Sequence, residues 1–172
     1  MNLNKIKLIE LTTKDYSDRY LQWMNDSRIT KFTEQKYIKH KKRDIINFIN
    51  QKKKSNTEFL YGIFFIENKK KIHLGNIKIG PINKIHLTAP ISYFLGETKY
   101  HGQGIVSVAI KKIIKIAKYK FKLKKLYAGF YKDNIGSKKV LKKNNFVFEG
   151  KFKYQLKIGK KRTDHIFYGL LL

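Results

Sequence analysis

The sequence predicts one mixed α/β domain over residues 1–172, and three observations support this. The length suits a single hydrophobic core, and 42% hydrophobic with 14% aromatic residues is the composition of a folded protein. No repeat, proline-rich linker or long Gly/Ser stretch divides the chain. Apolar runs of strand length alternate with segments of helical periodicity, in the order β-α-α-β-β-β-α-β-α-β-β. This order predicts a mostly antiparallel sheet with one β-α-β crossover.

The first half of the chain predicts a strand, two helices and three further strands. Ile6 and Leu8 alternate with polar residues, as in a strand with one buried face. Thr12 and Thr13 are suitable N-caps for a helix around 15–24, which places three aromatic side chains near one face: Tyr16, Tyr20 and Trp23. A second helix over 43–53 buries Ile45, Phe48 and Ile49. Strand-like runs follow at 59–66, 72–79 and 88–95, the first two joined by a hairpin turn at 67–70.

The second half predicts two helices and three strands. A helix with apolar spacing begins after a glycine loop at 100–105, and lysines occupy its other face. A strand at 125–131 leads into a short helix at 135–143, which Asn144-Asn145 can end in the left-handed conformation. The runs 146–152 and 163–172 form a closing antiparallel pair across a turn at Gly159.

The net charge of +27 invites comparison with nucleic-acid-binding proteins. The lysines, however, are spread over predicted turns, helices and loops alike, and arginine is scarce. Lysine, isoleucine and asparagine together are what an AT-rich coding sequence favours, so we interpret the charge as a compositional trait. It would still attract an anionic small ligand. A basic nucleic-acid-binding module stays open as the alternative of another class.

The composition also restricts the chemistry. The chain has no cysteine, which removes disulfides and thiolate catalysis, and its five histidines lack metal-ligand spacing, so we expect no metal. No apolar run approaches the roughly 20 residues that span a bilayer, and the first residues lack a signal-peptide core. We therefore expect a cytoplasmic protein without a membrane partner.

Two glycines mark the point where the strand at 88–95 leads into the next helix, in Tyr100-His101-Gly102-Gln103-Gly104-Ile105-Val106. Glycine lets the backbone turn tightly and point successive N–H groups at one spot. The helix N-terminus adds unpaired donors and a partial positive charge, which favours a phosphate group. The loop lacks the Gly-Lys-Ser/Thr of a nucleotide-hydrolysing P-loop and the third glycine of a dinucleotide fingerprint.

A second segment, from Asn134 to Phe146, begins where a strand gives way to a helix. The Asn134 side chain suits a helix N-cap, and it equally suits binding of a ligand's own amides. Ser137 lies one turn further and could project into the same cleft.

The two segments, in this order and spacing, resemble the GNAT superfamily of acetyl-CoA-dependent N-acetyltransferases, and the resemblance covers essentially the whole chain. The loop at 100–105 is similar to the family's Gln/Arg-x-x-Gly-x-Gly/Ala motif, and 134–146 is similar to its Asn-x-x-Ser…Leu-x-Lys-x-x-Phe segment. Segments 23–26 and 75–82 resemble the branch that contains ribosomal-protein alanine acetyltransferases and enzymes that acetylate nucleotide-linked amino sugars.

The resemblance implies a sheet of about seven strands flanked by helices, whose middle strands splay to open an acetyl-CoA cleft. The pantetheine arm would lie there like an added strand, against the backbone of Phe94, Leu95 and Gly96. Asn134 would hold this arm, and an N–H near Leu95 would polarise the acetyl carbonyl. The pyrophosphate would rest on the backbone of the glycine loop, namely His101, Gly102, Gln103, Gly104, Ile105 and Val106.

The chain departs from this family at two places that matter for proton transfer. Relatives often have Glu in the fourth strand, where this chain has Pro90, and Tyr as general acid, where it has Leu141. Ser137 then remains to assist departure of the thiolate. His86 has a side chain whose ordinary pKa suits a base for the amine. Because both usual groups are missing, a GNAT fold kept only to bind acyl-CoA stays open.

The positive net charge of the protein ranks the candidate acceptors. A basic protein repels a polyamine and, more mildly, the basic termini of ribosomal proteins, whereas it attracts an anionic nucleotide-linked amino sugar. We expect acetyl transfer to the amine of such a sugar, with protein N-terminal acetylation as the alternative. Tyr37, in a polar loop, and Glu34 are expected to face the acceptor. A homodimer also stays open.

Overall fold

The computed structural model describes residues 2–172, which contain a seven-stranded mixed sheet in the order β1-β2-β3-β4-β5-β7-β6. β4 and β5 run parallel, and every other pair of neighbours is antiparallel. The predicted fold class is confirmed. The strands span Ile6–Glu10 (β1), Phe59–Glu67 (β2), Lys70–Ile79 (β3), Thr88–Leu95 (β4), Lys125–Tyr131 (β5), Val147–Ile158 (β6) and Lys161–Leu171 (β7).

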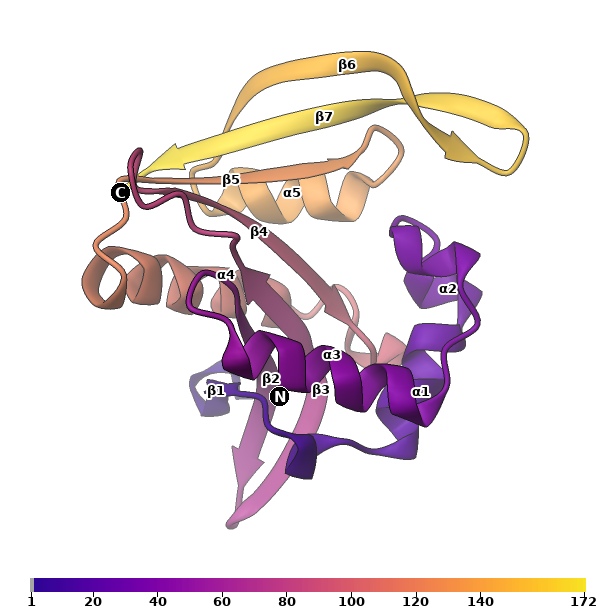
Figure 1. Ribbon diagram of the computed structural model, residues 1–172, viewed down its shortest axis with the longest axis vertical. Coiled ribbons are helices and arrows are strands. Elements are labelled where there is room, and N and C mark those ends of the chain that lie inside the picture. The colour runs from indigo at the N-terminus through magenta and orange to yellow at the C-terminus, as the bar shows by residue number, and fades with distance from the viewer. Residues whose placement is uncertain (1) are drawn as a thin grey trace.

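Helices cover both faces of the sheet (Figure 1). Before β2 lie α1 (Asp18–Asn25), α2 (Ser27–Thr30) and α3 (Lys42–Lys54). After β4 comes α4 (Ile105–Lys115), and after β5 comes α5 (Ile135–Lys143). Short 3-10 turns occupy Leu3–Lys5 (η1), Thr13–Asp15 (η2), Glu34–Tyr37 (η3) and Thr98–Tyr100 (η4), and a π-helical turn follows α4 at Ile116–Lys120 (η5).

The sheet separates two apolar clusters. On one side, α1 and α3 pack on β2 through Tyr20, Trp23, Ile45, Ile49 and Phe64. On the other side, α4 and α5 pack on the middle strands through a larger set that includes Leu74, Ile77, Ile110, Ile113, Leu126 and Leu141. Because β2 is buried on both faces, its sequence is a nearly continuous apolar run rather than an alternating one.

The first two helices differ in detail from the sequence prediction. α1 begins at Asp18, because the Ser17 side chain accepts a hydrogen bond from the Tyr20 N–H at 3.2 Å. Thr12 instead caps the short turn η2, where Asp15 accepts hydrogen bonds from its N–H and hydroxyl. The prediction that Phe48 is buried was wrong: its side chain is 37% exposed, while Ile45 and Ile49 are buried.

The last hairpin is longer than the sequence prediction. β6 continues to Ile158, well beyond the predicted end at 152, because the strand bulges between Phe152 and Leu156. Tyr154 within this bulge has a φ of 52°, so the alternation that identifies a strand is interrupted there. The predicted left-handed end of α5 is confirmed by Asn145, with a φ of 64°.

β4 and β5 pair only over their first residues, where Thr88, Ala89 and Pro90 lie opposite Lys125, Leu126 and Tyr127. Beyond these pairs the two strands diverge toward the side of the molecule where α2 lies (Figure 1). The predicted divergence is confirmed. It leaves one edge of β4 without a strand neighbour from Ile91 onward.

Candidate active site

The glycine loop between β4 and α4 leaves a row of unpaired N–H groups. Gly102 and Gly104 have φ values of 77° and 82°, a region that favours glycine, and Gly104 is the N-cap of α4. The backbone N–H groups of Gly102, Gly104, Ile105 and Val106 have no backbone hydrogen-bond partner within residues 2–172. A Cβ added at Gly102 would meet no atom within 4 Å, so the loop is open there. These donors and the helix dipole fit a pyrophosphate.

Two residues of the predicted phosphate site are used differently. The His101 N–H donates to the Thr98 carbonyl at 3.0 Å, and the Gln103 N–H donates to the Tyr100 carbonyl at 3.4 Å. Both donors are therefore occupied by the turn, which corrects the prediction that they face the ligand. The His101 ring is engaged as well, since its Nε2 lies 2.9 Å from the Leu95 carbonyl oxygen.

Along the free edge of β4, only every second residue points its backbone N–H and C=O groups away from β3. The Gly80 N–H donates to the Pro90 carbonyl, and the Gly96 N–H donates to the Leu74 carbonyl, so even-numbered residues of this segment bond to β3. Phe94 and Gly96 are thus committed to β3, which corrects their predicted contact with the pantetheine arm. Tyr93 and Leu95 point their backbone groups toward the splayed side. The Leu95 N–H therefore points toward the splay, where the sequence analysis expects it to polarise the acetyl carbonyl.

Asn134 and Ser137 meet at the start of α5, on the β5 side of the splay. The Asn134 Oδ1 accepts a hydrogen bond from the Ser137 N–H at 3.0 Å, so the residue is the N-cap. Its Nδ2 makes no hydrogen bond within the described residues and stays available to a ligand amide.

The Tyr93 hydroxyl is a buried polar group that lies beside Ser137. It has no hydrogen bond of good geometry within residues 2–172. Burial raises the pKa of Tyr93 to about 12, and the nearby Ser137 hydroxyl opposes this rise. A serine and a protonated tyrosine therefore lie together, two hydroxyl donors of which the sequence alone did not indicate Tyr93.

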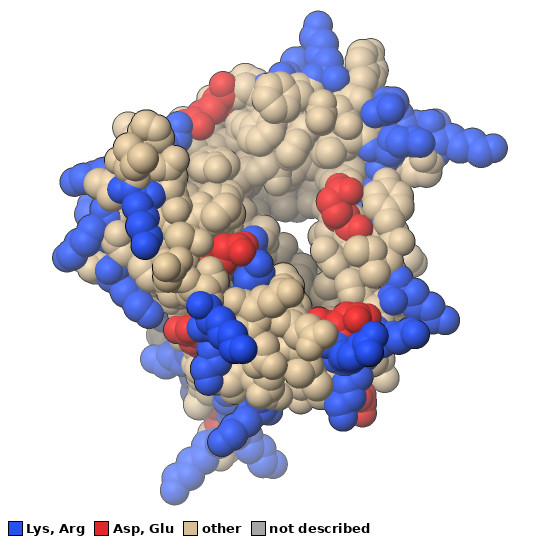
Figure 2. Space-filling view, in the orientation of Figure 1, with Lys and Arg blue, Asp and Glu red and all other residues tan. Residues whose placement is uncertain are grey.

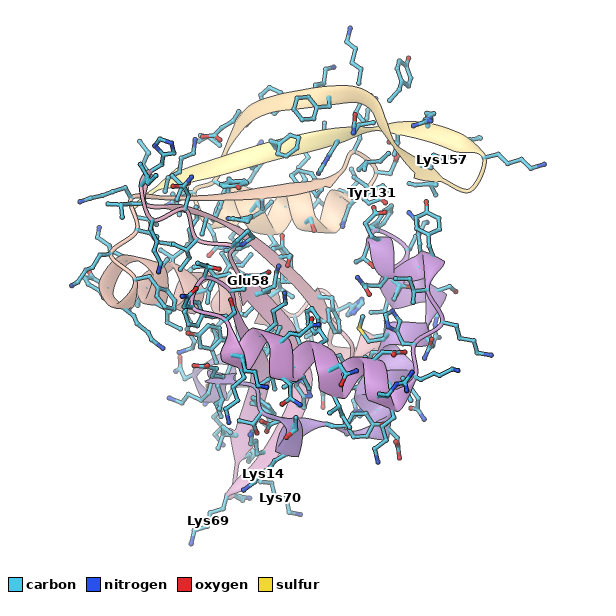
Figure 3. The ribbon with its side chains drawn as sticks, viewed as in Figure 1. Lys14, Glu58, Lys69, Lys70, Tyr131 and Lys157 are labelled. Atoms are coloured by element: carbon cyan, nitrogen blue, oxygen red, sulfur yellow. The ribbon has the colours of Figure 1, made fainter. Side chains whose placement is uncertain are left out.

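A second set of side chains lies where η3 approaches the last hairpin. The Tyr131 hydroxyl donates to the Glu34 carboxylate at 2.6 Å, and the Lys36 ammonium donates to the Tyr131 oxygen at 2.9 Å. Burial and the bond to Glu34 raise the pKa of Tyr131 above its ordinary value. The Tyr37 hydroxyl donates to the Lys157 carbonyl at 3.0 Å. Figure 3 shows Tyr131 and Lys157 together at this end of the molecule. The predicted residues Glu34 and Tyr37 are thus brought together.

The space-filling view shows an opening through the molecule between the two halves of the sheet (Figure 2). Acidic side chains stand around it, while most lysines point outward from the periphery. Close to the η3 contact lies a cavity of about 480 Å³ between α2, the β5–α5 loop and the last hairpin. It is lined by Lys31, Phe32, Lys132, Asp133, Tyr154, Ile158, Lys161, Arg162, Thr163 and Asp164.

His86, predicted as the base, lies apart from these groups. It is exposed in the turn before β4, where its N–H donates to the Asn83 side chain at 2.9 Å. This turn is at the paired end of β4, the end opposite to the glycine loop. The structure therefore corrects this prediction, because an exposed side chain beyond the paired end is not placed to take a proton in the splay. Leu141 is fully buried in the core.

Comparison with known proteins identifies the family. The model of the acetyltransferase (GNAT) domain family matches residues 5–147. A probable N-acetyltransferase of Bacillus subtilis (strain 168), YjcK, is 30% identical over 130 residues, which are 75% of this chain and 70% of that protein. The chain belongs to the GNAT acetyltransferase family.

Solved structures of GNAT acetyltransferases share the whole fold at lower identity. The spermidine N-acetyltransferase of Vibrio cholerae, in complex with CoA and spermine, has a TM-score of 0.85 at 18% identity, with 98% and 96% of the two chains covered. The microcin C7 self-immunity acetyltransferase MccE, in complex with acetyl-CoA and AMP, has a TM-score of 0.80 at 22% identity, with 98% of this chain and 93% of that chain covered. A ribosomal L7/L12 alpha-N-protein acetyltransferase in complex with CoA has a TM-score of 0.84 at 17% identity, with 98% of this chain and 94% of that chain covered.

Membership of the GNAT family fixes the reaction class. The protein is an acetyl-CoA-dependent N-acetyltransferase, and the open donors of its glycine loop fit the pyrophosphate of that donor. Within residues 2–172, no three His, Asp or Glu side chains gather as metal ligands would. The helices of this part of the chain are too short or too polar to cross a membrane.

Proposed function

We propose that this GNAT enzyme acetylates the amine of a nucleotide-linked amino sugar. The observation that carries the proposal is the basic cavity beside the Glu34–Tyr131 contact. Such an acceptor has a cationic amine at one end and phosphates at the other. The site offers an acidic group and a basic cavity next to each other, which suits both ends.

The lining of the cavity carries a net positive charge. Its cationic lining residues are Lys31, Lys132, Lys161 and Arg162. Two acidic residues stand in the same wall: Asp133 accepts from the Thr163 hydroxyl at 2.7 Å, and Asp164 accepts from the Tyr154 N–H at 3.1 Å and lies 4.0 Å from the Lys132 ammonium. Because four cationic side chains stand against two carboxylates, the net charge of the lining is positive and favours phosphate groups.

The cavity also lies within reach of the reacting end. Its lining residue Phe32 packs against Tyr131, with the ring centroids 5.9 Å apart. Tyr131 in turn bonds to Glu34, whose side chain is exposed. A nucleotide held against Lys132 and Arg162 would therefore extend its sugar amine toward Glu34. Phe32 and Tyr154 offer aromatic faces to the base or sugar.

On the opposite side of the splay, the chain's own groups would receive the donor. The N–H groups of the glycine loop would bind the pyrophosphate, Tyr93 and Leu95 would pair with the pantetheine arm, and Asn134 would hold it. Ser137, with Tyr93 behind it, would supply a proton to the departing thiolate. The amine would thus enter, and the thiol would leave, on opposite sides of the splay.

The solved structures that share this fold come from enzymes with different acceptors. Among the fold neighbours, one is a spermidine acetyltransferase, one acts on a ribosomal protein, and MccE was captured with AMP. MccE is in keeping with an acceptor that contains a nucleotide. Protein N-terminal acetylation remains the alternative, and it becomes an outcome of the test below.

The test is release of CoA thiol with three kinds of acceptor. UDP- and dTDP-linked amino sugars are compared with N-terminal peptides of ribosomal proteins and with spermidine. We expect turnover with at least one nucleotide-linked amine, and none when a hydroxyl replaces the amine in the same nucleotide sugar. Robust turnover of a peptide or of spermidine, with none for any nucleotide-linked amine, would contradict the acceptor and leave the enzyme class intact.

A further inference from the structure

We propose that His165 is the general base that removes the proton from the attacking amine. The inference rests on the acetyltransferase reaction and holds for whichever amine is accepted. Its starting point is a histidine that the sequence analysis did not single out, on β7, which pairs with the β5 edge opposite to the splay.

His165 lies on β7 directly opposite Tyr131 of β5 and Phe152 of β6. Gly129 and Tyr131 share one face of β5, because the alternate residues Ala128 and Phe130 are buried in the core beneath α5. A Cβ added at Gly129 would lie 2.3 Å from the His165 Nε2. The imidazole therefore lies close over Gly129, on the face of the sheet away from α5. This is the face on which Glu34 meets Tyr131.

The surroundings leave the imidazole free to accept a proton. The ring is half-buried and packs against Phe167, with the ring centroids 4.3 Å apart. Neither ring nitrogen of His165 makes a hydrogen bond to any of residues 2–172. Phe152 on β6 adds no charge, and Lys36 is engaged by Tyr131 and by the Lys157 carbonyl.

Glu34 is the acidic group that acts on His165. Burial lowers the pKa of His165, and the negative charge of Glu34 partly offsets this. At neutral pH the ring is therefore neutral and has a free lone pair. Tyr131 holds the Glu34 carboxylate through a 2.6 Å hydrogen bond, which fixes the charge beside the ring.

These groups account for each bond and proton that moves in the acetyl transfer. The amine nitrogen forms a bond to the thioester carbonyl carbon and becomes positively charged. His165 takes a proton from that nitrogen, and the imidazolium is stabilised by Glu34. The C–S bond breaks, its electron pair leaves with the thiolate, and Ser137 or solvent returns a proton to sulfur. The amide and the free thiol are the products.

The first experiment titrates His165 by NMR in the protein without substrates. We expect its imidazole signal to titrate below the ordinary pKa of about 6.5, and lower still in Glu34→Gln, which removes the neighbouring negative charge. The exposed His86 serves as an internal reference in the same spectra. A His165 titration unchanged by Glu34→Gln would overturn the pairing of the two groups.

The second experiment measures rates with the best acceptor found among the UDP-linked amine, the peptide and spermidine. His165→Gln should lower kcat about 100-fold and remove the acidic limb of the pH profile, while affinity for acetyl-CoA is retained. Gly129→Ala forces the ring aside and should lower kcat in part. If His165→Gln keeps the acidic limb, or if His86→Gln removes it instead, the proposal is wrong. If His165→Gln does not fold, the proposal is tested by the kcat of Gly129→Ala and by the NMR titration of His165.

Discussion

At the scale of single residues, Gly102 allows a test of the donor site. In Gly102→Gln, the added Cβ meets no protein atom within 4 Å, and the bulky side chain stands on the loop that carries the free N–H groups. We expect the Kd for acetyl-CoA to rise at least ~10-fold, equal to about 1.4 kcal/mol. Gly159→Gln is the matched control: Gly159 also has a positive φ, of 59°, and open space around it, but it lies in the β6–β7 turn. Equal affinity of the two variants in calorimetry would contradict the site.

The sequence motifs identified the right loop and the right helix start but not the use of each atom. Gly102, Gly104 and Asn134 were predictable because glycine and N-cap preferences are local. The roles of Phe94 and Gly96 were not, because the alternation of hydrogen bonds along β4 depends on its register with β3. His165 carries no local signal at all. Its neighbours Gly129 and Glu34 come from distant parts of the chain.

At the scale of elements, the junction between α1 and β4 supports the glycine loop. The Trp23 ring packs on Gly96 so closely that a Cβ there would lie 2.0 Å from a ring atom. The Trp23 Nε1 donates to Glu97 at 3.0 Å, and Arg19 forms an ion pair with the same carboxylate. Glu97 directly precedes the turn η4 that leads into the loop. This contact therefore ties the start of the loop to α1.

Glu97 makes the junction sensitive to acid. Burial opposes its ionisation, but the bonds from Arg19 and Trp23 outweigh burial and hold the pKa of Glu97 below its ordinary value. A carboxyl with a depressed pKa stabilises the fold fully above about pH 4.3 and loses this contribution as the pH falls through its folded pKa.

Glu97→Gln should accordingly lower the free energy of unfolding by about 1 kcal/mol at pH 7, and by progressively less below pH 4.3. Denaturant titrations at several pH values measure the difference. Glu67→Gln removes the exposed ion pair with Lys5 and should change stability by less than about 0.5 kcal/mol. A loss for Glu97→Gln that persists undiminished in acid would show that ionisation plays no part.

The elements themselves were predictable in unequal measure. β4, β5 and α5 have the predicted bounds, because each is an apolar or periodic run closed by turn residues. The short helix α2 and the turn η3 are polar and were missed, although η3 carries Glu34 and Tyr37. The place of η3 is set by tertiary contacts with β5 and β6, which no local pattern shows.

At the scale of the whole molecule, positive and negative side chains are distributed differently. The positive charge of +27 is spread around the periphery, whereas acidic side chains stand at the opening (Figure 2). In Figure 3, Glu58 lies on the β2 side of this opening and Tyr131 on the β5 side. Glu58 is paired with Lys52 and Lys78, each at 2.6 Å, while Glu34 is bound by a tyrosine. A basic exterior thus draws in anions, and a local carboxylate receives the amine.

This separation predicts opposite salt dependences for acceptors of opposite charge. For a UDP-linked amine, kcat/KM should fall as salt rises from 50 to 500 mM, because the Debye length shrinks below ~10 Å, whereas for spermidine it should rise. Removing two charges in Lys132→Gln/Lys161→Gln, at the cavity, should weaken the fall strongly. The same loss in Lys69→Gln/Lys70→Gln, at the distant β2–β3 turn, should barely change it (Figure 3). Equal slopes for the two double variants would mean that the total charge, and not the cavity, guides the acceptor.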